Sequence, residues 1–240
     1  MRSYCQTDVG IKRNMNQDFV YASDQHVGAL PNLLIVADGM GGHNAGEYAS
    51  RFAVEAMVDY IGQSDQTRPV SLLRGAVEAA NESVYSHAMA DRSMEGMGTT
   101  LVAATIVDDC LYVANIGDSR LYILDDGIEQ ITRDHSLVEE MVRAGALTPE
   151  NARTHPDKNV ITRAIGISGK IRADYFDVPL NPTDIILLCS DGLTNMIEDE
   201  KILKIVKGAA SLEDAARELI NTANRNGGLD NISVILARPD

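Results

Sequence analysis

The sequence predicts an α+β protein in which mostly antiparallel sheets are sandwiched by helices. Two observations predict this class: strand-like runs rich in β-branched residues occur in blocks, and helix-like segments occur in pairs between those blocks. A doubly wound parallel sheet would instead alternate single strands with single helices. The 240-residue chain has no visible repeat or low-complexity stretch, so we expect one domain spanning residues 1–240.

Seven segments have the composition of strands and are bounded mostly by Asp, Gly, Asn or Pro. They are residues 32–37, 100–107, 111–116, 120–124, 174–178, 184–189 and 231–237. The run "IVDDCLYVANIGDSRLYILDDGIEQI" indicates a meander of antiparallel strands, with turns at "DD", at "GDS" and at Asp126-Gly127.

Apolar residues at a spacing of three to four predict helices over residues 46–61 and 71–89. Two further helices are expected near residues 198–207 and 211–224. Thr148 followed by Pro149 is typical of a helix start. We expect Asp134 and Ser136 to cap a helix. We expect His135 to be held in one orientation by hydrogen bonds rather than to bind a metal.

Composition excludes several classes of partner. The net charge is -14, from 35 acidic against 21 basic residues, and no cluster of Lys and Arg exceeds two residues, so a nucleic-acid partner is not expected. No apolar run approaches the ~18 residues of a membrane span, and the first residues lack the apolar core of a signal peptide. The three cysteines form no C-x-x-C pair. We therefore expect a cytoplasmic protein without a membrane partner.

Five aspartates stand within one or two residues of a hydrophobic strand: Asp18, Asp38, Asp118, Asp191 and Asp230. Side chains from adjacent strands can meet at one rim of a sheet, and carboxylates brought together there would repel unless a cation neutralises them. Hard divalent ions such as Mg²⁺ or Mn²⁺ suit oxygen ligands. Each aspartate is alternatively a turn residue, and spacing alone leaves that choice open.

The glycine-rich stretch "DGMGGHNAG" raises the alternative of a nucleotide-binding enzyme. The stretch lacks both G-x-G-x-x-G and G-K-[ST], and it opens with an acid that would repel phosphate in the absence of a metal. The sequence therefore disfavours this alternative.

Six sequence motifs, in their order along the chain, are similar to those of one known family. They are "TDVGIKRNMNQDFV", "VADGMGGHNAGEYAS", "GMGTTLVAA", "ANIGDSRLYIL", "CSDGLTNMI" and "GGLDNISVI". From Thr7 to Ile235 the chain resembles the metal-dependent protein phosphatases of the protein phosphatase 2C type, in their short bacterial form. The resemblance implies a four-layer α/β/β/α sandwich, with two central sheets flanked by helix pairs.

The resemblance also implies a two-ion core site that uses Mn²⁺ or Mg²⁺. Asp38 would bridge the two ions, and Gly39 would offer its backbone carbonyl to one of them. Asp191 and Asp230 would hold the other ion. Asp18 matches an acidic position near the centre, acting directly or through a metal-bound water.

Two further positions match the family. Asp118, together with Asp191, matches the ligands of a third and looser ion. Arg13 matches the arginine that grips the substrate phosphate, with a surface arginine as the alternative. The implied reaction is hydrolysis of phosphoserine and phosphothreonine by a metal-activated water, without a covalent phosphoenzyme.

The chain departs from the family pattern at two points. Gln17 stands where many relatives have a glutamate, which removes one negative charge beside Asp18. The histidine proposed as general acid in animal relatives has no clear match. His43 is a candidate for that role, and a metal-bound water is the alternative.

The resemblance implies partners as well. We expect phosphorylated proteins, the products of a serine/threonine kinase, as substrates of a monomeric enzyme. Residues 144–158 match a mobile flap that would tune substrate choice. The alternative function is that of a non-catalytic phosphoprotein-binding member of the same fold, which loss of the metal aspartates would mark.

Overall fold

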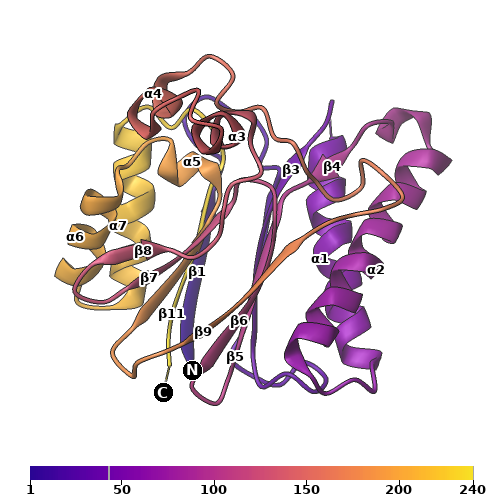
Figure 1. The fold of residues 1–240 in the computed structure, drawn as a ribbon, viewed down its shortest axis with the longest axis horizontal. Helices are drawn as coiled ribbons and strands as arrows, with labels where there is room; N and C mark the ends of the chain where they lie inside the picture. The colour runs from indigo at the N-terminus through magenta and orange to yellow at the C-terminus, as the bar shows by residue number, and fades with distance from the viewer. Residues whose placement is uncertain (43, 240) are drawn as a thin grey trace.

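The strands form two antiparallel sheets packed face to face, and a pair of helices covers the outer face of each sheet (Figure 1). A computed structural model gives the structure, and it describes residues 1–42 and 44–239. The four layers agree with the predicted α/β/β/α sandwich, which is confirmed.

One sheet has the strand order β1-β11-β10-β7-β8. Its strands are β1 Arg2–Asp8, β7 Arg120–Leu124, β8 Ile128–Gln130, β10 Ile185–Cys189 and β11 Ile232–Arg238. β1 pairs with β11 along its whole length, so the two chain ends lie side by side at one end of the sandwich (Figure 1).

The other sheet has the order β2-β3-β5-β6-β9, with β4 paired to β3. Its strands are β2 Asp18–Ser23, β3 Leu33–Met40, β4 Gly98–Thr99, β5 Leu101–Val107, β6 Cys110–Ile116 and β9 Asp174–Pro179.

The long helices α1 Ala45–Gln63 and α2 Pro69–Ala90 cover the β3 sheet, and α6 Asp199–Gly208 and α7 Leu212–Arg225 cover the β11 sheet. Three short helices gather at the end of the sandwich opposite the chain termini (Figure 1): α3 Leu137–Arg143, α4 Pro149–Thr154 and α5 Asp191–Thr194. A 3₁₀ turn, η1, covers Arg92–Met94. In the described part of the chain, no helix is both long and apolar enough to cross a membrane.

The composition of β3 follows from burial on both of its faces. Leu33, Ile35 and Ala37 belong to the core that the sheet shares with α1 and α2. Leu34 and Val36, which point the other way, belong to the core between the two sheets. An uninterrupted apolar run is therefore required here, and it ends where Asp38 reaches the edge of the core.

Most predicted elements lie within two residues of the observed ones. The predicted Asp126-Gly127 hairpin joins β7 to β8, and Thr148 caps α4 as expected. The sequence does not predict strand β1, because "RSYCQTD" carries few β-branched residues.

The predicted meander is wrong at "GDS". β6 and β7 belong to different sheets and do not pair, so the chain crosses from one sheet to the other through Gly117 and Asp118. Gly117 has φ +100°, and a Cβ there would come within 2.6 Å of the Thr100 side chain. The crossing therefore depends on glycine, and it places Asp118 between the two sheets.

Candidate metal centre

A cavity of about 240 Å³ opens at the end of the sandwich where the predicted aspartates gather. Six of the predicted site residues line it: Arg13, Asp38, Gly39, Asp118, Asp191 and Asp230. These residues are far apart in the sequence, and the two sheets bring them together.

The β3 sheet supplies Asp18 and Asp38 as a cross-strand pair at the ends of β2 and β3. The Asp38 backbone is fixed by Thr100, whose hydroxyl accepts a hydrogen bond from the Asp38 amide at 3.0 Å. Asp18 is buried behind Asp38 and is not among the residues that line the cavity.

The β11 sheet supplies Asp191 and Asp230. Asp191 begins α5 directly after β10, and Asp230 precedes β11. The Ser190 hydroxyl donates a hydrogen bond to the Asp18 carboxylate at 2.8 Å, across the boundary between the sheets. This hydrogen bond fixes the carboxylates of one sheet relative to those of the other.

Gly39 packs so closely that no other residue fits. A Cβ at this position would overlap the carbonyl oxygen of Gly46 and approach that of Gln17 to 2.7 Å. The Gly39 amide also donates to the Gln17 carbonyl at 3.0 Å. The glycine therefore lets α1 begin directly against the end of β3. Its role as a metal ligand stays a prediction.

Burial and mutual repulsion destabilise the charged form of these carboxylates. Burial raises the pKa of Asp38 well above its ordinary value, and the charges of the other four aspartates raise it further. Burial raises the pKa of Asp118 well above its ordinary value, with Asp191 adding to the effect. Burial also raises the pKa of Asp18 to about 7 and that of Asp191 to about 6.

The carboxylates fit a hard divalent cation. Asp18 Oδ1 and Asp191 Oδ1 are buried without a hydrogen-bond partner among the described residues. Oxygen ligands with excess negative charge are what Mg²⁺ and Mn²⁺ require. In the described part of the chain, no three His, Cys, Asp or Glu side chains converge as one complete cage. Carboxylates that do not converge on one point suit ions that bind one or two carboxylates each and keep several water ligands.

Arg13 supplies positive charge at the cavity. Its guanidinium donates to Asp230 Oδ2 at 2.8 Å, and its side chain is about half exposed. Asn231 anchors the loop that carries Arg13, because its Nδ2 donates to the carbonyls of Val9 and Met15, both at 2.9 Å. The contact with Asp230 occupies only one of the five guanidinium donors.

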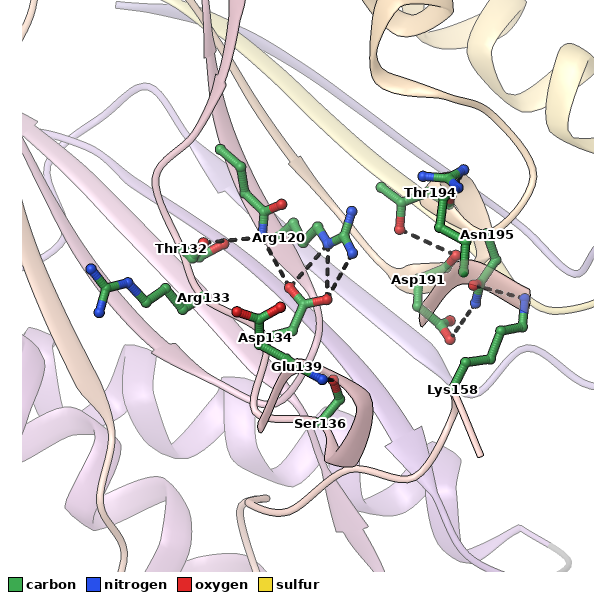
Figure 2. A network of polar contacts seen from close by, with 12 residues as sticks. Arg120, Thr132, Arg133, Asp134, Ser136, Glu139, Lys158, Asp191, Thr194 and Asn195 are labelled. Carbon is green, nitrogen blue, oxygen red and sulfur yellow. Dashed lines mark hydrogen bonds and ion pairs between the residues drawn. The ribbon is translucent and has the colours of Figure 1, made fainter. Parts of the chain in front are cut away.

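Asn195 is a site residue that sequence reasoning missed. Its Nδ2 donates to Asp191 Oδ2 at 2.8 Å, and its Oδ1 accepts from Lys158 at 3.1 Å, as Figure 2 shows. The amide therefore holds one carboxylate oxygen of Asp191 and leaves Oδ1 free. The four-residue spacing of Asp191 and Asn195 across a helix start was the available signal.

A second cavity of about 260 Å³ shares Asp118 and Asp191 with the first. Arg120 lies in it and makes a partly buried ion pair with Asp134, at 2.8 Å (Figure 2). The predicted capping role of Asp134 is therefore wrong, because its carboxylate is taken by Arg120, and Ser136 alone caps α3. Residues 144–158 reach this cavity through α4 and Lys158.

His135 is oriented by hydrogen bonds, as predicted. Its Nδ1 accepts from the Gly117 amide at 3.1 Å, and its Nε2 lies 3.2 Å from Asp174. This histidine holds the crossing between the sheets. His43, the predicted general acid, lies outside the described residues.

A face-to-face sandwich of two sheets, with a cavity lined by four aspartates at one end, is the arrangement expected of a metal-dependent enzyme of the α/β/β/α class. The sequence profile described as Protein phosphatase 2C matches residues 10–237. The chain therefore belongs to the protein phosphatase 2C family.

Named relatives agree with this assignment. Protein phosphatase PhpP of Streptococcus pneumoniae is 43% identical, with 96% of this chain and 94% of that protein covered. The serine/threonine phosphatase PstP of Mycobacterium tuberculosis has a solved structure that matches with a TM-score of 0.91 at 36% identity, covering 100% of this chain and 98% of that one. The catalytic domain of PstP, solved in complex with two manganese ions, matches with a TM-score of 0.88 at 35% identity, covering 99% and 97%.

The raised pKa values predict how stability depends on pH. Between the unfolded and the folded pKa values, the metal-free folded protein retains protons that the unfolded chain releases, which stabilises the fold. This stabilisation is fully present below the pKa of an aspartate in the unfolded chain, near 4. It is lost as pH rises through about 6 to 7. With a chelator present, we expect Tm to fall by several degrees between about pH 5 and about pH 8. Asp18→Asn should flatten this fall, whereas Asp59→Asn, on an exposed part of α1, should not. A Tm that rises between about pH 5 and about pH 8 would contradict the raised pKa values of these aspartates.

Asn195 provides a second test. Asn195→Ala should free the second oxygen of Asp191 to rotate and should weaken Mn²⁺ binding by roughly 10- to 100-fold, measured by titration calorimetry. Asn221→Ala, the same substitution at an exposed position of α7, is the matched control and should leave the affinity unchanged. An unaltered Mn²⁺ affinity in Asn195→Ala would show that Asp191 needs no such support.

Proposed function

We propose that this protein is a Mn²⁺- or Mg²⁺-dependent phosphatase that removes phosphate from phosphoserine and phosphothreonine in proteins. The observation that carries the proposal is the gathering of five aspartates at one end of the sandwich, four of them lining one cavity and two, Asp18 and Asp191, with an unpartnered buried oxygen. Family membership and relatives named serine/threonine phosphatases support the same activity.

Each aspartate has a proposed role in holding cations. Asp38, at the centre of the group, would lie between two ions, with the Gly39 carbonyl completing one site. Asp191 and Asp230 would hold the other ion, and Asp118 with Asp191 would bind a third. Divalent ions held by these residues would supply a metal-activated water as the nucleophile near neutral pH.

Arg13 would orient the substrate. Its remaining donors can hold two phosphate oxygens in a planar, bidentate arrangement, while Asp230 fixes the direction of the guanidinium. This alignment would present phosphorus for in-line attack, and the leaving oxygen would then require a proton. His43 stays a prediction for that proton donor.

Several finer statements are part of the proposal. We propose that the protein acts in the cytoplasm as a monomer, opposes a serine/threonine kinase, and binds neither nucleic acid nor membranes. The acidic composition and the lack of Lys/Arg clusters support the absence of nucleic acid. We also propose that residues 144–158 form a flap of this single domain that tunes substrate choice, since Arg153 and Lys158 attach it to α5.

The alternative of a non-catalytic phosphoprotein-binding protein is disfavoured by the site. Such a protein would have no need to maintain four close carboxylates with raised pKa values, at Asp18, Asp38, Asp118 and Asp191, since their repulsion costs folding free energy. All five aspartates are present, and Arg13 lies beside them.

Hydrolysis of a phosphothreonine peptide tests the proposal. The rate should depend on added Mn²⁺ and vanish with a chelator, and Asp38→Asn should lower kcat/KM at least about a hundredfold, because it removes the central cation ligand. Asp126→Asn, in the fully exposed β7–β8 turn, is the matched control. Full activity after complete metal removal, or in Asp38→Asn, would refute the mechanism.

A further inference from the structure

Exposed apolar side chains gather beside the acidic cavity. In the described residues, eight large apolar side chains are exposed, and four of them, Val9, Ile11, Met15 and Leu229, lie on the two loops that carry Arg13 and Asp230. Ile11 is 62% exposed and Leu229 is 53% exposed. We call these four residues the apolar rim. A charged cavity has no need of an apolar border for its own stability, so the rim requires a separate explanation.

The two loops are tied together and present the rim as a preformed surface. The amides of Ile11 and Lys12 donate to the Gly228 carbonyl at 2.8 and 3.0 Å. A Cβ at Gly228 would come within 2.7 Å of Ile11 Cγ1, and one at Gly227 would lie 3.7 Å from Leu229 Cδ2. Ile11 and Leu229 therefore flank the same pair of glycines.

The rim also has a defined position relative to the phosphate-binding group. Ile11 is two residues from Arg13, and Leu229 adjoins Asp230, which Arg13 contacts. Two residues of chain span at most about 7 Å, in the enzyme and in an extended peptide substrate alike. A substrate side chain one or two positions from the phosphorylated residue can therefore reach the rim.

We propose that the apolar rim binds a large apolar side chain of the substrate, one or two positions from the phosphoserine or phosphothreonine. The proposal rests on the proposed phosphatase function and adds a sequence preference to it. The occupant is a segment of the phosphoprotein because the rim continues the surface that holds the phosphate. The close contacts between the loops reduce the entropy lost on binding.

A peptide series tests this directly on the unmodified enzyme. The peptides carry one phosphothreonine among serines, with a leucine placed in turn at each of the two positions before and after it. At one or more of these positions, leucine should raise kcat/KM by roughly tenfold, mainly through a lower KM. Equal rates across the whole series would overturn the proposal.

A double substitution locates the effect. Ile11→Ser with Leu229→Ser should remove the leucine preference, while hydrolysis of p-nitrophenyl phosphate, which has no flanking residues, changes less than about twofold. Met89→Ser, at an exposed apolar position of α2 outside the cavity lining, should retain the preference.

The remaining outcomes separate the two proposals. A preference that survives the double substitution would overturn the role of the rim. A dimer that the double substitution converts to a monomer, with peptide preference unchanged, would assign the rim to self-association and also overturn it. If the unmodified enzyme with Mn²⁺ hydrolyses neither the peptides nor p-nitrophenyl phosphate, the proposed phosphatase function itself is wrong, and this inference is overturned with it.

Discussion

Repulsion among buried carboxylates is the constraint on which the rest of this structure depends. Asp38 is buried, and four other aspartates raise its pKa further. Such a group is stable only if it takes up protons or is neutralised by cations. Among the described residues, Arg13 is hydrogen-bonded to Asp230, and the charges of Lys158 and Arg120 act on Asp191 without preventing the rise of its pKa to about 6. Divalent cations are therefore the natural counter-charge near neutral pH, and the proposed chemistry follows from their presence.

The sandwich holds the repelling groups together because each is attached to a rigid element. Asp38 follows a strand buried on both faces, and Asp191 follows the buried strand β10. The Ser190–Asp18 hydrogen bond joins the two sheets at the site, and the chain crossing at Gly117 brings in Asp118. Folding free energy from three apolar cores thus maintains a polar arrangement that would not persist by itself.

Much of this could be predicted from the sequence, since apolar periodicity reports burial and an aspartate after a strand reports a rim position. The sequence could not show that β6 and β7 lie in different sheets, because a turn of Gly and Asp is compatible with both a hairpin and a crossing. It also could not show that Asp134 pairs with Arg120, or that Asn195 holds Asp191, since side-chain partners depend on tertiary packing. For Asn195, the sequence shows only its four-residue spacing from Asp191.

The proposed role of the aspartate group is to bind paired cations. Anomalous diffraction at the manganese edge, from crystals grown with Mn²⁺, measures this directly. We expect two strong peaks on either side of the Asp38 carboxylate, with Asp191 and Asp230 contacting one of them. Two peaks at this position would place the counter-charge where the carboxylates require it. A map with no peak at Asp38, in crystals that bind manganese elsewhere, would show that Asp38 is not a cation ligand.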